Sequence, residues 1–161
     1  MTDIALVWNA DTAQADFAVN ASVFDLLTDD GLQTAVIISL MTDRLAADDE
    51  TPPDGSSDRR GWWGDLPVDG SMPTDNDLIG SKLWLRTREK ANAASALLIQ
   101  NDCQDALAWM IADGLAQDVS VTATWLTAEQ LGLVVAISRY TQRGAVETKK
   151  YDLIWNAALA A

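Results

Sequence analysis

The stretch Asp118-Val119-Ser120-Val121-Thr122-Ala123-Thr124-Trp125-Leu126 alternates apolar and polar side chains over most of its length. Side chains of a strand point alternately to opposite faces of a sheet, so a period of two predicts a half-buried β-strand over residues 118–126. Two further runs, residues 131–140 and 149–156, also predict strands, and the connections between the three are short. Short connections are typical of antiparallel neighbours. The last third of the chain therefore predicts a meander, whose third strand places three large side chains on one face: Tyr151, Leu153 and Trp155.

Two helices are predicted upstream of this meander. Thr28-Asp29-Asp30-Gly31 offers a hydroxyl for an N-cap and two acids for the first turn, and apolar side chains recur at helical spacing from Leu32 to Met41. A longer helix is predicted from about Asn92 to Asp113, and Gly114 is placed to cap its end. Both helices are expected to pack on the apolar face of the meander.

Two residues of the longer helix and one short run carry further expectations. Cys103 lies on the apolar face of that helix and is interpreted as a small buried hydrophobe. Trp109 lies towards an edge of the same face. The apolar run at residues 82–86 predicts a helical turn that begins at Ser81.

At the N-terminus, residues 3–9 predict a strand that is a candidate fourth member of the sheet. A polar stretch follows at residues 10–20, and residues 23–27 lead into the first helix. The predicted fold class is α+β, with an antiparallel sheet of three to four strands, the C-terminal meander plus the N-terminal strand, packed on two main helices. With 161 residues, the chain is expected to form a single domain over residues 1–161.

Composition and charge narrow the classes of function. No apolar run approaches the ~20 residues that a membrane span requires, and the start Met1-Thr2-Asp3-Ile4 has no signal segment, which predicts a protein made in the cytoplasm. A net charge of −13 argues against a nucleic-acid surface, so the expected partners are proteins. There is no histidine and one cysteine, which disfavours a zinc site and acid–base catalysis by histidine, and no cofactor is expected.

The most unusual chemistry lies in Asp58-Arg59-Arg60-Gly61-Trp62-Trp63-Gly64-Asp65, inside a long acidic loop at about residues 46–80. The pair of tryptophans is an apolar anchor within a polar excursion. It pins the loop to its own domain, because burying two indoles contributes several kcal/mol, or it contacts a partner, because Trp and Arg are enriched at interface hot spots. The intramolecular role is favoured, since long loops in compact domains need something to hold them.

The carboxylates of this loop are candidate catalytic or metal-binding groups. Asp58 and Asp65 flank the tryptophans, as acids flank a sugar in many glycosidases, but pairing with Arg59 and Arg60 or exposure to water is favoured. The run Asp48-Asp49-Glu50 lacks the spacing of a calcium loop and is interpreted as a solvated acidic segment. No catalytic residue and no metal site are predicted.

Six segments together resemble the small baseplate protein of Mu-like phages and prophages, a divergent branch of the small lysozyme-like wedge subunits of contractile tails. The most specific is the run Arg59-Arg60-Gly61-Trp62-Trp63-Gly64-Asp65, and the match covers nearly the whole chain in order. The wider family carries a Glu-Pro-Arg motif between its long helix and the next strand, whereas this chain has Asp113-Gly114-Leu115-Ala116-Gln117-Asp118-Val119 there. The other segments of the resemblance are residues 26–32, 42–44, 80–85, 106–109 and 151–155.

The resemblance implies a structural, non-enzymatic component of the tail baseplate, assembled in the host bacterial cytoplasm. Its implied partners are other wedge and hub proteins and the tail sheath, whose assembly it would help to seed; it implies no nucleic acid and no membrane. A free strand edge, from residues 149–155 or the N-terminal strand, would also allow the isolated chain to form a homodimer. The alternative is a peptidoglycan- or glycan-acting module that uses Trp62, Trp63 and nearby acids. The proposed interaction residues are Arg59, Arg60, Trp62, Trp63, Asp65, Tyr151 and Trp155.

Overall fold

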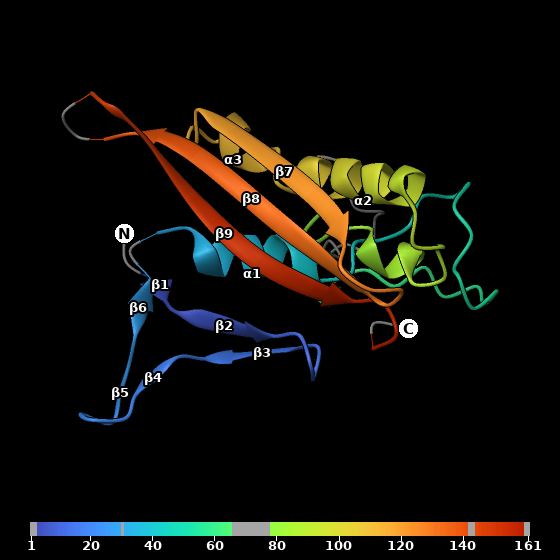
Figure 1. Cartoon of the computed structure of the whole chain (residues 1–161), viewed down its shortest axis with the longest axis horizontal. Coiled ribbons are helices and arrows are strands. Elements are labelled where there is room, and N and C mark those ends of the chain that lie inside the picture. Colours follow the sequence, from blue (N-terminus) through green and yellow to red (C-terminus); the bar gives the residue numbers. More distant parts are fainter. Residues whose placement is uncertain (1–2, 30, 66–77, 142–143, 160–161) are drawn as a thin grey trace.

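The computed structural model describes residues 3–29, 31–65, 78–141 and 144–159. Its largest sheet is an antiparallel meander of three strands, β7 (Asp118–Trp125), β8 (Gln130–Tyr140) and β9 (Val146–Asn156), in the order β7-β8-β9. Figure 1 shows the helices gathered on one face of this sheet. The α+β class and the C-terminal meander are therefore confirmed, although β9 begins three residues earlier than the sequence predicts.

The core lies between the inner face of the sheet and the helices. The alternation in β7 and β8 places every second side chain inward, and these pack against the apolar faces of the two main helices. Each fully buried aliphatic or aromatic side chain of this kind contributes about 1.5–3 kcal/mol relative to exposure. The largest fully buried side chains of the sheet are Leu131, Leu133, Val135 and Ile137.

The longer predicted helix is two helices in the structure. α2 (Ala93–Ala106) begins at Asn92, whose side chain forms a capping box with Ser95. At the end of α2 the N–H of Leu107 donates to the carbonyl of Gln104, three residues earlier, which is the tighter hydrogen-bond spacing of a 3-10 turn. The short helix α3 (Trp109–Ala112) follows. This break was not predicted, because the apolar residues continue at helical spacing across it. Gly114, at φ +72°, ends α3 in the left-handed conformation that the sequence predicts there.

Two expectations about these helices are confirmed. Cys103 is fully buried in the core, and this burial raises the pKa of its thiol far above the usual range. The indole of Trp109 lies at the edge of the helical layer, where its Nε1–H donates to Ser39 Oγ at 3.1 Å.

The first helix, α1 (Gln33–Met41), begins later than predicted. Thr28 does not cap it, because Thr28 and Asp29 form strand β6 (Thr28–Asp29), which pairs with β1 (Asp3–Ile4). The acid contributes in another way: the carboxylate of Asp29 accepts the N–H of Thr34 at 2.9 Å and that of Gly31 at 2.8 Å. It thereby satisfies an N–H group of the first helical turn that has no partner within the helix.

The N-terminal strand does not join the main sheet as a fourth strand. Residues 3–29, which we call the N-terminal arm, form three two-stranded antiparallel ribbons. β1 pairs with β6, β2 (Leu6–Asn9) pairs with β3 (Gln14–Phe17), and β4 (Val19–Asn20) pairs with β5 (Asp25–Leu26). The polar stretch and the helix lead-in expected within residues 10–27 thus contain three short strands joined by turns.

The three ribbons meet at a cyclic junction of backbone hydrogen bonds. Ala5 N–H donates to Leu27 O, Leu27 N–H donates to Ala18 O, and Ala18 N–H donates to Ala5 O, at 2.8–2.9 Å. The junction lets the β4–β5 hairpin leave the body of the molecule while β2 stays against it (Figure 1). Local backbone pairing therefore built this arm, which apolar periodicity did not reveal.

The long loop is irregular in its described residues, 46–65 and 78–80, and residues 66–77 lie outside the described part of the chain. It contains one short 3-10 helix, η1 (Trp63–Asp65), and is followed by η2 (Leu83–Arg86), the helical turn predicted after Ser81. Ser81 Oγ–H donates to Leu40 O and so fastens the end of the loop to α1. Over the described ranges, no helix has the length and apolar character needed to cross a membrane.

Candidate interaction site

Arg59 closes the first part of the loop on itself. Its carbonyl accepts the N–H of Ala46 at 3.0 Å, while its guanidinium Nε donates back to the carbonyl of Ala46 at 2.7 Å. The same guanidinium pairs with Asp48. Because Ala46 is fully buried, these bonds attach residues 46–59 to the body of the domain at one point.

Arg60 attaches the loop to the core side of the domain. Its guanidinium lies 4.7 Å from the centroid of the Trp84 ring and pairs with Asp43 at 2.8 Å. Trp84 is buried, with 2% of its surface exposed, and its Nε1–H donates to Arg44 O. A guanidinium over an indole contributes about 0.5–1 kcal/mol at an exposed site and more when desolvated. Arg60 therefore joins the loop to a rigid, buried aromatic ring.

The backbone then turns sharply outward. Arg60 has φ +50° and Gly61 has φ +104°, and a Cβ on Gly61 would lie 3.1 Å from the Leu45 side chain. Glycine adopts this conformation at no steric cost, whereas other residues are strained there. The turn brings the two tryptophans to the surface directly after the anchored arginines.

Trp62 and Trp63 form a tilted aromatic pair with ring centroids 5.3 Å apart. Trp62 lies over Gly64, where a Cβ would come within 2.2 Å of its ring, so Gly64 leaves the space that this indole occupies. Trp63 points away, with 78% of its surface exposed compared with 37% for Trp62. The pair therefore presents one supported and one largely solvent-exposed indole.

Asp65 bonds residues on both sides of it in the chain, Trp62 and Ile79. Its N–H donates to Trp62 O at 3.0 Å, and its carboxylate accepts the N–H of Ile79 at 3.2–3.3 Å. This contact joins Asp65 to Ile79. The sequence predicts that Asp58 and Asp65 pair with the two arginines or face water; in the structure, Arg59 and Arg60 form ion pairs with Asp48 and Asp43, and Asp58 accepts the backbone N–H of Arg60.

The loop is thus attached to the domain by the two arginines rather than by the two tryptophans. Arg59 and Arg60 make the hydrogen bonds, ion pairs and ring contact that fasten it, while Trp63 is mostly exposed. Sequence reasoning did not assign these roles, since the partners of Arg60, Asp43 and Trp84, are distant in the chain.

Tyr151 and Trp155 belong to the core. Tyr151 has 6% of its surface exposed and its hydroxyl accepts the N–H of Leu32, while Trp155 has 3% exposed and packs against Trp125 with ring centroids 6.5 Å apart. A partner can therefore reach this strand through its backbone edge rather than through these two side chains. Trp8 already uses part of that edge, because its Nε1–H donates to Ile154 O at 2.8 Å.

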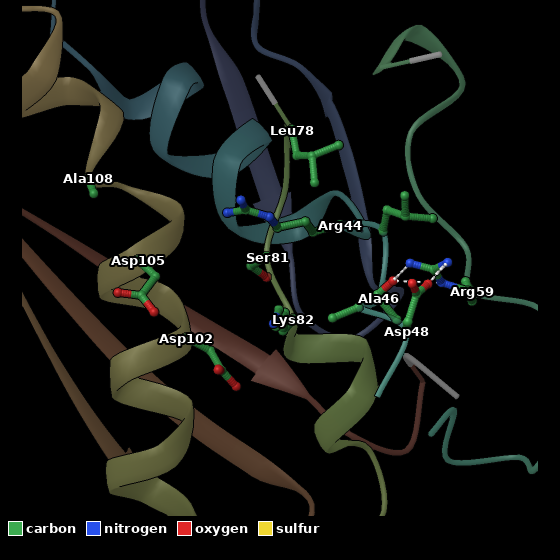
Figure 2. Close-up of a pocket in the computed structure, with 12 residues that line it drawn as sticks. Arg44, Ala46, Asp48, Arg59, Leu78, Ser81, Lys82, Asp102, Asp105 and Ala108 are labelled. Atoms are coloured by element: carbon green, nitrogen blue, oxygen red, sulfur yellow. Dashed lines mark hydrogen bonds and ion pairs between the residues drawn. The ribbon is translucent and has the colours of Figure 1, made fainter. Parts of the chain in front are cut away.

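A charged cleft of about 680 Å³ lies beside the anchored loop. Figure 2 shows Asp102 and Asp105 on α2 at one side of the cleft and the two separate segments that carry Arg44 and Ser81 at the other. Asp102 pairs with Arg86 at 2.6 Å, which raises the pKa of that guanidinium although its burial opposes the shift. Charges that line the cleft thus serve to bind one part of the chain to another.

Glu50 is a second acid whose charge is used in a contact within the chain. It pairs with Lys82 at 2.8 Å and accepts the N–H of Ala47 at 2.8 Å. Partial burial raises its pKa, but these two hydrogen bonds outweigh that effect, so the pKa of Glu50 is lowered. Together with the Arg59–Asp48 pair, this places the acidic run 48–50 in intramolecular contacts, and no cluster of three metal-ligating side chains occurs within the described ranges.

The N-terminal arm is a second surface that the sequence did not single out. Its side chains include several large apolar groups that remain exposed, with Phe24 the most exposed at 91%. The signal in the sequence that could have marked this surface is its composition, since no lysine or arginine precedes Arg44. The other strongly exposed apolar residues of the arm are Val7, Phe17, Val19 and Val23.

Comparison with known proteins gives consistent results. The model of the family described as phage protein GP46 matches residues 32–145. The chain is 41% identical over 138 residues to the "Baseplate protein gp46" of Escherichia phage Mu, covering 86% of this chain and 88% of the phage protein. It is 32% identical over 156 residues to the "Mu-like prophage FluMu protein gp46" of Haemophilus influenzae, covering 97% and 99% of the two chains.

Proposed function

Since the chain belongs to the family of phage protein GP46, and is a Mu-like phage baseplate protein, we propose that it joins wedge proteins of a contractile tail baseplate. In this role it contacts other wedge and hub proteins and helps to seed the tail sheath, without catalysis. Its place is the virion tail, after assembly in the cytoplasm of the host bacterium. The observation that carries the proposal is the anchored tryptophan pair on a domain related to a named baseplate protein.

The tryptophan pair has the properties of a docking anchor. Trp63 is exposed, but contacts of Arg60 and Asp65 already hold the backbone on either side of it. The loop therefore loses little conformational entropy when a partner binds. An indole buries about 150–250 Å², which at roughly 25 cal/mol per Å² is about 4–6 kcal/mol before the costs of association. Trp and Arg residues of this kind dominate binding energy at many protein interfaces.

The two outer strands of the main sheet differ in how far their edges are closed. On β7, the Gln104 side chain bonds the carbonyl of Val119 and accepts the N–H of Val121, and Gln100 accepts the N–H of Ala123. α2 therefore covers that edge. On β9, Trp8 bonds Ile154 near the C-terminal end, while the side chains of residues 146–150 are exposed. An open strand edge is a template for strand addition, so β9 is the edge that we assign to a sheath or wedge strand.

The test of the docking role is incorporation into tails. A phage or prophage lacking this gene is complemented with wild-type, Trp63→Ala or Leu126→Ala protein, and the chain is quantified in purified particles by mass spectrometry. Leu126 is the matched control, since it is an exposed apolar residue, at 56%, outside the tryptophan loop. Trp63→Ala protein should be depleted from particles while Leu126→Ala protein is retained. Normal incorporation of Trp63→Ala protein would refute the docking role of the indole.

The glycan-acting alternative gains no support from the geometry of the loop. Asp58 and Asp65 accept hydrogen bonds from Arg60 and Ile79 of their own loop; Asp58 lies on irregular backbone, and Asp65 ends the three-residue 3-10 helix η1. A glycosidase holds two carboxyl groups about 5–10 Å apart across a substrate cleft on rigid elements. Lysis of cell walls by the purified chain, lost in Asp58→Asn or Asp65→Asn, would overturn the structural role.

A further inference from the structure

The β4–β5 hairpin at the end of the N-terminal arm is folded by its own bonds yet leaves its apolar side chains uncovered. Val19 and Leu26 are cross-strand partners and so share one face, with 57% and 44% of their surfaces exposed. The turn is fixed by Asn20, whose carbonyl accepts Val23 N–H and whose side chain accepts Ser22 N–H. Phe24 stands at the tip with φ +52° and 91% exposure. A strained backbone that displays a fully exposed aromatic side chain is typical of a binding element.

The charge of the arm is of a single sign. Residues 3–29 contain five aspartates and neither lysine nor arginine. Asp25 lies within the hairpin, where it pairs with Asn20 on the face opposite Val19 and Leu26, and Asp16 lies on the neighbouring strand β3 beside Phe17. Each carboxylate accepts only the N–H of the residue that follows it among the hydrogen bonds of the described residues. The surface that fits this hairpin therefore combines apolar groups with positive charge.

The distal end of the β8–β9 hairpin has that complementary character. Tyr140 and Val146 are cross-strand partners with 63% and 56% of their surfaces exposed. Lys150 lies on the same face of the hairpin as these two side chains, while Arg139, Lys149 and the acid Glu147 lie on the opposite face, where Lys149 packs over the Tyr151 ring. In a chain of net charge −13 this is a local reversal of sign. It is a small apolar patch with a basic border.

The two surfaces lie at the same end of the molecule. In Figure 1 the β4–β5 hairpin and the distal end of β8–β9 both project beyond the helices at the end of the long axis that also holds the N-terminus. Two copies facing each other at this end can make the same contact twice, which is the arrangement of a twofold interface. We propose that the chain forms a reciprocal dimer in which the β4–β5 hairpin of each copy packs on the distal β8–β9 end of the other.

This inference does not rest on the baseplate role, and a charge exchange tests it on the isolated protein. One variant carries Asp16→Lys and Asp25→Lys, so that both its surfaces are basic; the other carries Arg139→Glu and Lys150→Glu, so that both are acidic. Neither variant should pair with itself, because each reversed contact is repulsive. A mixture of the two should form a dimer, because both contacts become attractive again. Dimer affinity is measured by sedimentation equilibrium, and each variant alone should lose about tenfold or more relative to wild type.

A neutral variant tests the apolar part of the contact. Phe24→Asn suits the left-handed backbone, since asparagine tolerates positive φ, and should weaken the dimer while leaving the melting temperature unchanged. Leu97→Asn on the outer side of α2, where Leu97 is 57% exposed, is the matched control and should dimerise as wild type does. Wild-type protein that remains monomeric at every concentration, or a mixture of charge variants that remains monomeric while wild type pairs, would overturn the proposal. Binding of the hairpin to another baseplate protein in place of self-association would also overturn it.

Discussion

Replacement of Arg60 by alanine should detach the tryptophan loop from the domain without unfolding it. Arg60 makes an ion pair with Asp43 in which 30% and 43% of the two side chains are exposed, and its guanidinium lies 4.7 Å from the Trp84 ring centroid. Solvent-exposed ion pairs contribute about 0.2–1 kcal/mol, and a cation over an indole contributes about 0.5–1 kcal/mol. The expected loss is therefore about 1–2 kcal/mol in the free energy of unfolding.

That loss can be measured by urea denaturation and by thermal unfolding, where it corresponds to about 2–8 °C in Tm for a chain of this length. The contribution of the ion pair is separated by a double-mutant cycle with Asp43→Asn, whose coupling energy should lie at about 0.2–1 kcal/mol. Arg88→Ala is the control, because Arg88 is exposed and makes no ion pair within the described ranges.

A second readout follows the loop itself. Limited proteolysis within residues 46–65 should become faster in Arg60→Ala protein than in Arg88→Ala protein, because the loop loses one of its attachments. Equal stability and equal cleavage rates in the two variants would refute the idea that Arg60 anchors the loop. The tryptophans would then have to be held by other contacts.

Three further predictions follow from the described contacts. Gly80→Ala should lower the free energy of unfolding by about 1–3 kcal/mol, because φ at this position is +105° and the new Cβ would lie 2.4 Å from the carbonyl oxygen of Thr42. Gly55→Ala is the control: its new Cβ would have no neighbour within 4 Å, so it should lower the free energy of unfolding by less. Denaturant titration measures both changes. The lowered pKa of Glu50 contributes stability that is present above its unfolded pKa of 4.5 and is lost as the pH falls through the lower folded value; Lys82→Met should reduce this acid sensitivity in thermal scans at graded pH. Cys103, buried and with a raised pKa, should react with a thiol reagent only after unfolding, and rapid modification of the native protein would contradict its placement in the core.

The main sheet could be predicted from the sequence because one of its faces is buried. Burial of that face imposes the alternation seen at Val119 and Val121, and the same rule places the apolar residues of β8. The N-terminal arm could not be predicted in this way. Its strands are two to four residues long, and exposed apolar side chains such as Val7 and Val19 remove the contrast between faces.

The interaction site was only partly predictable for a related reason. The unusual composition of residues 58–65 marked the site, but composition does not say which groups fasten it and which are presented. The roles of Arg59 and Arg60 depend on partners brought near by the fold, Ala46 and Trp84, and the burial of Tyr151 depends on the packing of α1 against β9. Side chains that look alike in the sequence thus divide between core and surface.

The central claim is that this domain is a structural baseplate component that docks through its anchored tryptophans. It is tested most directly by co-expression with the other baseplate proteins encoded beside it, followed by mass measurement of the purified complex and a cell-wall lysis assay on the same material. The account predicts a heteromeric complex without lysis, and loss of that complex in Trp63→Ala but not in Leu126→Ala protein. A chain that enters no complex and cleaves glycan, with activity lost in Asp58→Asn or Asp65→Asn, would contradict it.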